Sequence, residues 1–238
     1  MADYTTHVTT STVLGVGYGA AAYLLGDVPL PACVLAGGLC GVSGMLPDLD
    51  SESGVPVREG SAFAAAVVPM LMIDRFQHLG WTSEMMALAG GGIYLTIRIM
   101  LPFLLGKFSK HRGMWHSLPA CLIAGLAAFL ICSGPSLGIR CFKAGGVMLG
   151  FMSHLLLDEF YSFEVRRGRL RVKHSFGTAI KFFSKNPWAN FSTYGKLVAL
   201  LVLAVGDPLL MEHYHMHPTD EAHRTAEKIQ ETINNALR

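Results

Sequence analysis

The sequence is poor in charged residues. Asp, Glu, Lys and Arg make up 15% of its 238 residues, while 51% are hydrophobic, and a typical soluble protein carries about 25% charged residues. This shortage argues against an ordinary soluble domain and favours a protein whose helices contact lipid. The formal net charge of +2 is too small to indicate a nucleic-acid partner, so we expect none.

Thiolate sites and several common catalytic motifs are also missing. The five cysteines form no CxxC pair, and their odd number argues against a disulfide framework. Four of them, Cys33, Cys40, Cys121 and Cys132, lie inside apolar runs and are predicted to be small buried hydrophobes. There is no GxSxG, Walker or HExxH motif, so serine hydrolases, P-loop NTPases and zincins have no support. No basic segment precedes the first apolar run, and we expect that run to stay in the mature protein.

The apolar runs predict an all-α fold. Strand-like alternation is scarce, and Ala, Leu, Met and Gly dominate. The runs fall at 12–26, 30–46, 61–73, 86–105, 118–132, 143–157 and 197–211. Most are shorter than the ~20 residues of a full span, which leaves open whether 61–73 and 197–211 cross a membrane. Their Gly and Ala content suits close helix contact in lipid, so we predict a multi-helix transmembrane bundle, with a soluble helical enzyme as the alternative.

The chain divides into one large domain and a tail. Residues 1–211 form the predicted membrane-embedded domain, which includes a basic, aromatic segment at 162–196. That segment is predicted either to lie against anionic headgroups or to be a solvated loop. Residues 212–238 carry His213, His215 and His217 and end in a short amphipathic helix, through which the chain can form a homo-oligomer.

Counting the apolar runs as successive crossings brings the polar motifs to one end of the bundle. The motifs are His7 before the first run, PDLD after the second, HRGMWHS after the fourth and SHLLLDE at the end of the sixth. If every run traverses the bundle once, all four motifs reach the same face. The candidate metal ligands are therefore His7, Asp48, Asp50, His111, His116, His154 and Asp158.

These residues suit one kind of chemistry. His154 and Asp158 are four residues apart, so on a helix they share a face. A set of imidazoles and carboxylates without thiolates suits a divalent cation, zinc first and Mn²⁺ or Mg²⁺ as alternatives. Asp50 or Asp158 is the candidate to orient a water, and Arg112 to contact a phosphate-like anion. Each motif alone has a plainer interpretation: a helix-stabilising pair, a capping turn, or an interfacial loop with Trp115 as anchor.

The basic residues gather on the same face as the motifs. Twelve of them, from Arg58 to Lys196, fall on that face, and only Arg75, Arg140 and Lys143 fall on the other before the last run. The positive-inside tendency predicts that the face with the motifs is cytoplasmic.

In this order among apolar helices, His7, PDLD at 47–50, HRGMWHS at 111–117 and HLLLD at 154–158 resemble the YdjM-like family of bacterial inner-membrane proteins, described as membrane-bound metal-dependent hydrolases. The resemblance covers about residues 5 to 160. It implies a relation to the all-helical zinc-dependent phospholipase C and nuclease superfamily, with a zinc cluster that cleaves phosphoesters. It assigns as ligands the same seven residues that counting the runs selects.

We therefore predict a multi-pass inner-membrane hydrolase that cleaves a phosphoester, of a lipid or of another substrate, with a metal-activated water. The alternative is a metal-binding membrane protein without chemistry, such as a transporter or a sensor. A transporter needs ionisable residues near the middle of the membrane, and in this sequence nearly all of them lie at the ends of the runs, with Arg98 the exception.

Overall fold

A computed structural model describes residues 3–50, 54–103, 114–132, 134, 136–166, 169–172 and 180–214. For Asp50 and for the strand residues only the backbone is described. The elements are α1 (Tyr4–Leu25), α2 (Leu30–Ser43), the 3-10 turn η1 (Pro47–Asp50), α3 (Val55–Leu71), α4 (Ile73–His78), α5 (Ser83–Leu95), the π-helical turn η2 (Thr96–Met100), α7 (Leu118–Ile131), α8 (Leu137–Phe160), β1 (Phe163–Arg166), β2 (Arg169–Val172), α9 (Pro187–Val205) and α10 (Pro208–His213).

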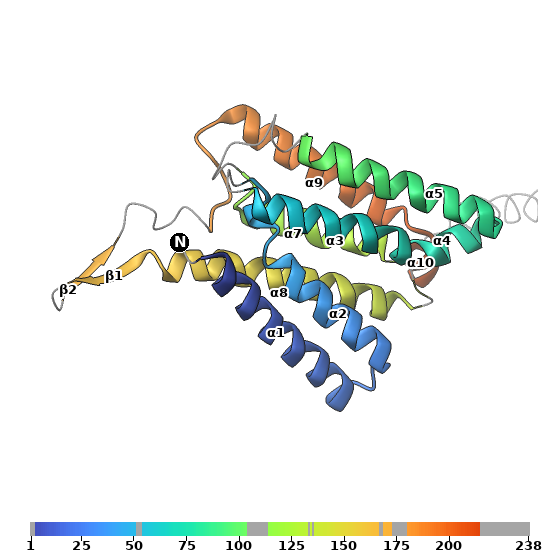
Figure 1. The fold of residues 1–238 in the computed structure, drawn as a ribbon, viewed down its shortest axis with the longest axis horizontal. Coiled ribbons are helices and arrows are strands. Elements are labelled where there is room, and N and C mark those ends of the chain that lie inside the picture. Colours follow the sequence, from blue (N-terminus) through green and yellow to red (C-terminus); the bar gives the residue numbers. More distant parts are fainter. Residues whose placement is uncertain are drawn as a thin grey trace, which may run out of the picture.

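The all-α prediction is confirmed. The helices form an elongated bundle in which α8 lies against α1, α2 and α7, and α7 in turn contacts α9 (Figure 1). A second pair, α3 and α5, packs side by side. Small residues allow the first group to approach closely. A Cβ atom at Gly15 would collide with the carbonyl oxygen of Gly37, and one at Gly150 would collide with that of Cys40.

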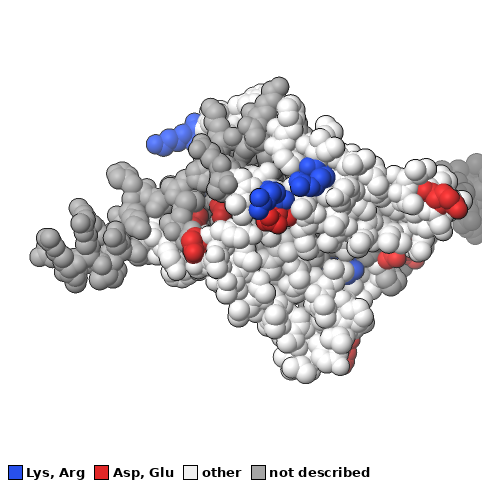
Figure 2. Space-filling view, in the orientation of Figure 1, with Lys and Arg blue, Asp and Glu red and all other residues white. Residues whose placement is uncertain are grey.

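Four helical segments are long and apolar enough to cross a membrane: Tyr4–Leu25, Val55–His78, Ser83–Phe103 and Pro187–Val205. The run at 61–73 thus belongs to a longer segment of sufficient length. Helix α5 has no buried residue, and most of the visible described surface lacks charged residues (Figure 2). An apolar surface of this extent suits contact with lipid.

Two features of the later part of the chain were not specified by the sequence analysis. The run at 197–211 is not one helix, because α9 ends at Val205 and α10 begins at Pro208, after Gly206 and Asp207. Part of the segment 162–196 forms an antiparallel hairpin in which β1 pairs with β2, Phe163 opposite Val172. The short strands alternate apolar and charged residues, a period of two that a basic loop would not need.

A buried ion cluster joins three helices at the end of the bundle opposite the C-terminus of α8. Asp207 caps α10 by accepting a hydrogen bond from the backbone N–H of Leu209. Its carboxylate accepts hydrogen bonds from Arg140 on α8 and Arg75 on α4. Asp207 and Arg140 are 4% and 2% exposed, so their charges are stabilised mainly by each other.

Candidate metal centre

Five of the seven predicted ligands meet at one end of the bundle. They are His7 from α1, Asp48 from η1, His116 from the turn before α7, and His154 and Asp158 from α8. Their side chains form two groups, His7 with His154 and Asp158, and Asp48 with His116 and His154. Within each group one ligand atom of every residue lies within 4.8 Å of the others, which is close enough to share a cation.

Helix α8 fixes the shared member of the two groups. His154 and Asp158 lie one turn apart, and His154 Nδ1 is 2.7 Å from the carbonyl oxygen of Gly44 at the end of α2. Because a carbonyl oxygen only accepts, Nδ1 carries the proton and Nε2 of the neutral ring keeps its lone pair. His154 Nε2 is buried without a hydrogen-bond partner, and it faces Asp158 Oδ2 at 3.7 Å and Asp48 Oδ1 at 3.6 Å.

A tryptophan brings His116 beside Asp48. Trp115 Nε1 donates a hydrogen bond of 2.7 Å to the carbonyl oxygen of Leu46, two residues before Asp48. Ser117 then caps α7 by accepting from the N–H of Ala120. His116 Nε2 lies 3.7 Å from Asp48 Oδ1. The indole N–H of Trp115 is thus bonded within the protein, and the interpretation of its ring as an interfacial anchor stays a prediction.

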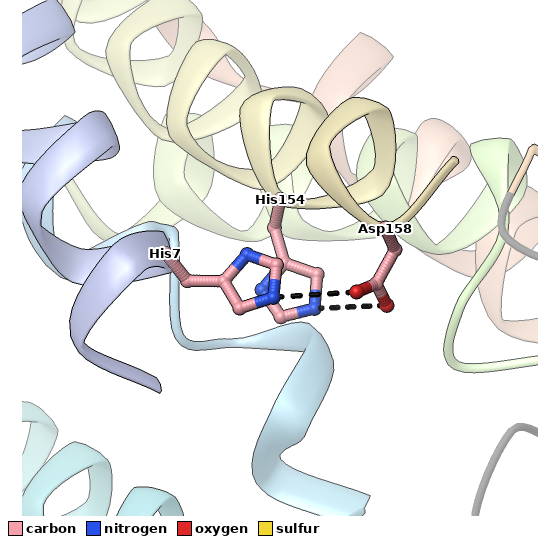
Figure 3. Close-up of side chains that lie close together, drawn as sticks. All are labelled: His7, His154 and Asp158. Carbon is pink, nitrogen blue, oxygen red and sulfur yellow. Dashed lines mark ion pairs between the residues drawn. The ribbon is translucent and has the colours of Figure 1, made fainter. Parts of the chain in front are cut away.

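Helix α1 supplies the remaining imidazole. Ser11, one turn after His7, donates a 2.7 Å hydrogen bond to the carbonyl oxygen of Gly41 and so holds α1 against α2. The ring of His7 stacks on that of His154, with centroids 3.6 Å apart and planes 13° from parallel. His7 Nε2 faces Asp158 Oδ1 at 3.3 Å (Figure 3). Each oxygen of Asp158 thus faces a different imidazole.

The site is enclosed on the side of the helices and more open at Asp48. His7, His116, His154 and Asp158 are 5% exposed or less, whereas the Asp48 side chain is 17% exposed. Burial alone would raise the pKa of Asp48, but its interactions with His116, His154 and His7 outweigh this effect and hold the pKa below its ordinary value. Asp48 is therefore ionised at neutral pH and is the most exposed of the five clustered side chains.

The structure does not describe the side chains of several residues that the sequence analysis assigned to the site or left as candidates. His111, Arg112, His215 and His217 lie outside the described residues, and of Asp50 only the backbone in η1 is described. His213 is the last residue of α10 and is exposed. The roles of these residues stay predictions. The sequence analysis missed two groups that position the site, the Gly44 carbonyl and the Trp115 indole. Only the position of Trp115 directly before His116 could have indicated a role for one of them.

The sequence profile of the family described as YdjM inner membrane protein matches residues 3–211. This range includes the five clustered residues and every described helix except the last two residues of α10. The chain belongs to this inner-membrane protein family. No curated protein and no solved structure matched the chain.

Proposed function

We propose that this inner-membrane protein is a metal-dependent hydrolase that cleaves a phosphoester, of lipid or other origin, at the cluster of His7, Asp48, His116, His154 and Asp158. The observation that carries the proposal is the meeting of three imidazoles and two carboxylates, drawn from four separate segments, in a mostly buried place. Buried groups of this kind are costly unless they are paired or bind a cation.

The distances between the side chains suit a cation. Ligand atoms about 2.0–2.1 Å from one tetrahedral zinc ion lie about 3.4 Å from each other. The four nitrogen-to-oxygen distances in the cluster run from 3.3 to 3.7 Å. These separations exceed the 2.7–3.2 Å of ordinary N–H···O hydrogen bonds. The unpartnered Nε2 of His154 would gain a ligand bond in such a site.

The stacked rings favour two ions over one. The lone pairs of His7 and His154 lie in nearly parallel planes, so both cannot point at the same ion without tilting a ring. Asp158 presents one oxygen to each ring, as a bridging carboxylate does.

The residues then have separate roles in the proposed reaction. A bound divalent ion would supply positive charge that lowers the pKa of water and stabilises the oxygens of a phosphoryl group. His7 and His154 would each serve as a ligand of a different ion, His116 would act beside Asp48, and Gly44 keeps His154 in the correct tautomer. Asp158, buried against two imidazoles, would bridge and orient, with Asp50 the other candidate to orient a water. Asp48 lines the more open side, and Arg112 is proposed to contact the substrate phosphate.

Metal content and turnover, measured on the same detergent-purified samples, test the proposal. We expect wild-type protein to hold stoichiometric zinc, manganese or magnesium by elemental analysis and to hydrolyse a chromogenic phosphodiester. His154→Ala and Asp158→Asn should each lower metal affinity by more than about tenfold, since even outer partners of metal ligands contribute 10–100-fold, and turnover should fall with it.

His78→Ala is the matched control, because His78 is exposed at the end of α4 and lies outside the cluster. This variant should keep wild-type metal content and turnover. Wild-type values in both site variants would refute the metal assignment. Metal bound as expected, with no turnover on phosphomonoesters, phosphodiesters or lipids, would instead favour a metal transporter or sensor.

A further inference from the structure

Four exposed aromatic side chains gather where α9 begins. Phe182, Phe183, Trp188 and Phe191, which we name the aromatic collar, are 58%, 68%, 74% and 71% exposed. Trp188 stacks on Phe191 with ring centroids 5.7 Å apart. Nothing in the described part of the chain covers these rings. Large apolar side chains gathered at one surface mark a place where something apolar binds.

The backbone beneath the aromatic collar is held in place. Ser184 and Asn190 exchange two hydrogen bonds of 2.7 and 2.9 Å, and Tyr194 donates one of 2.9 Å to the carbonyl oxygen of Phe182. The exposure of the rings is therefore set by a bonded scaffold, which presents them outward in a fixed arrangement.

The aromatic collar continues a lipid-facing stripe. On α9 the exposed residues Trp188, Phe191, Gly195, Val198, Val202 and Val205 follow one another at steps of three and four, the spacing of a single helix face. Helix α9 is also one of the segments long and apolar enough to span a membrane. The aromatic rings thus lie just before α9 and in its first two turns, at the end of a candidate span, where Trp side chains are enriched at the headgroup layer.

The charges near the aromatic collar fit the same surface. Residues 180–195 contain no Asp or Glu but contain Lys181 and Lys185, and the next basic residue, Lys196, lies at the middle of α9. Aromatic rings flanked by lysines are the composition of segments that bind the boundary between headgroups and acyl chains. A protein partner would not require the stripe to continue down a helix that crosses the bilayer.

The aromatic collar is tied to the metal-binding end of the bundle. The N–H of Leu118, two residues after His116, donates a 3.2 Å hydrogen bond to the carbonyl oxygen of Lys181. Figure 1 shows the start of α9 at the same end of the bundle as the C-terminus of α8, which carries His154 and Asp158. We infer that the aromatic collar lies in the headgroup layer of the bilayer and seats the metal-binding end of the bundle at that depth.

Depth-dependent quenching of tryptophan fluorescence tests this inference without any assay of activity. The protein is reconstituted in nanodiscs whose lipids carry bromine either near the top of the acyl chain or near its methyl end. The emission of Trp188 is obtained as the difference between wild type and Trp188→Phe. We expect bromine near the top of the chain to quench it at least twofold more strongly than bromine near the methyl end.

Moving the tryptophan down the stripe provides the matched comparison. Val198 lies ten residues beyond Trp188, about 15 Å along a helix. In a Trp188→Phe background, Val198→Trp should therefore be quenched more strongly by bromine near the methyl end. Trp188 emission that responds to aqueous iodide but to neither brominated lipid would overturn the inference, and so would an equal depth for the two positions. Neither result would bear on the proposed hydrolase activity, which is tested separately by metal content and turnover.

Discussion

The exchange of Asp207 for Asn tests how far one carboxylate stabilises the end of the bundle opposite the candidate metal centre. Asp207 Oδ1 accepts from Arg140 Nη1 at 2.6 Å, and Oδ2 accepts from Arg140 Nη2 and Arg75 Nη2, both at 2.8 Å. Arg140 also donates to the carbonyl oxygen of Phe129. Without the charge on Asp207, the buried guanidinium of Arg140 has no other counter-charge among the described residues, a change that costs about 3–5 kcal/mol in buried pairs.

The two arginines should contribute unequally. The Arg140 side chain is 3% exposed, whereas that of Arg75 is 31% exposed and can turn toward a polar environment. Replacing Arg140 by Gln removes the buried counter-charge of the Asp207 carboxylate and should also lower the free energy of unfolding by about 3–5 kcal/mol. Replacing Arg75 by Gln should cost about 1 kcal/mol or less, as for a pair near the surface.

Thermal unfolding in detergent, followed by circular dichroism of the helices, measures these differences. For a chain of this size 1 kcal/mol shifts Tm by about 2–4 °C. Asp207→Asn and Arg140→Gln should therefore lower Tm by about 6–20 °C, and Arg75→Gln by no more than about 4 °C. Equal losses at the two arginines, or an Asp207→Asn variant within about 4 °C of wild type, would refute the reasoning.

Three further results are expected. Burial alone raises the pKa of Asp207, but the arginine hydrogen bonds lower it from 3.8 to about 2, so the stability it confers should be complete above about pH 4 and lost as the pH falls toward 2, measured as Tm against pH. Gly150→Ala should cost about 1–3 kcal/mol by overpacking against Cys40, whereas Gly91→Ala, with open space around it, should not destabilise. Chelation should lower Tm, and zinc at 100 times its Kd should restore about 2.7 kcal/mol.

Counting the apolar runs predicted that the candidate ligands meet at one end of the bundle, because charged groups are excluded from the apolar middle of such a bundle. The polar side chains were therefore expected near helix ends, and the number of crossings before each one, odd or even, decided at which end of the bundle it lies. They are His7, Asp48, His116, His154 and Asp158. The distances between them were not predictable. They depend on backbone groups such as the Gly44 carbonyl, whose position comes from the packing of α2 on α8.

The Asp207 cluster was missed, although the sequence carries a signal for it. Asp207 stands alone inside the run at 197–211, between Gly206 and Pro208. A single carboxylate in an apolar run needs a cationic partner, and Arg75, Arg140 and Lys143 were the available residues on that face. Which of them pairs with Asp207 depends on how α4, α8 and α10 converge, and the order of the runs does not specify this. The structure shows that Arg75 and Arg140 do.

The hairpin was missed for a different reason. Phe163 and Val165 alternate with Glu164 and Arg166, a strand pattern, but over only four residues. In so short a stretch the pattern cannot be told from a basic loop.

Helix α8 is held near its N-terminus by the hydrogen bonds between Arg140 and Asp207, so a change of tilt there would displace the other end of the helix. His154 lies fourteen residues beyond Arg140, about 21 Å along the helix. A tilt of α8 by about 5° about Arg140 would therefore move the His154 imidazole by about 2 Å. Metal-to-ligand distances tolerate errors of only about 0.2 Å. The positions of His154 and Asp158 therefore depend on the Arg140–Asp207 hydrogen bonds at the opposite end of the bundle. A substitution there should weaken the proposed metal binding without changing any of the candidate ligands.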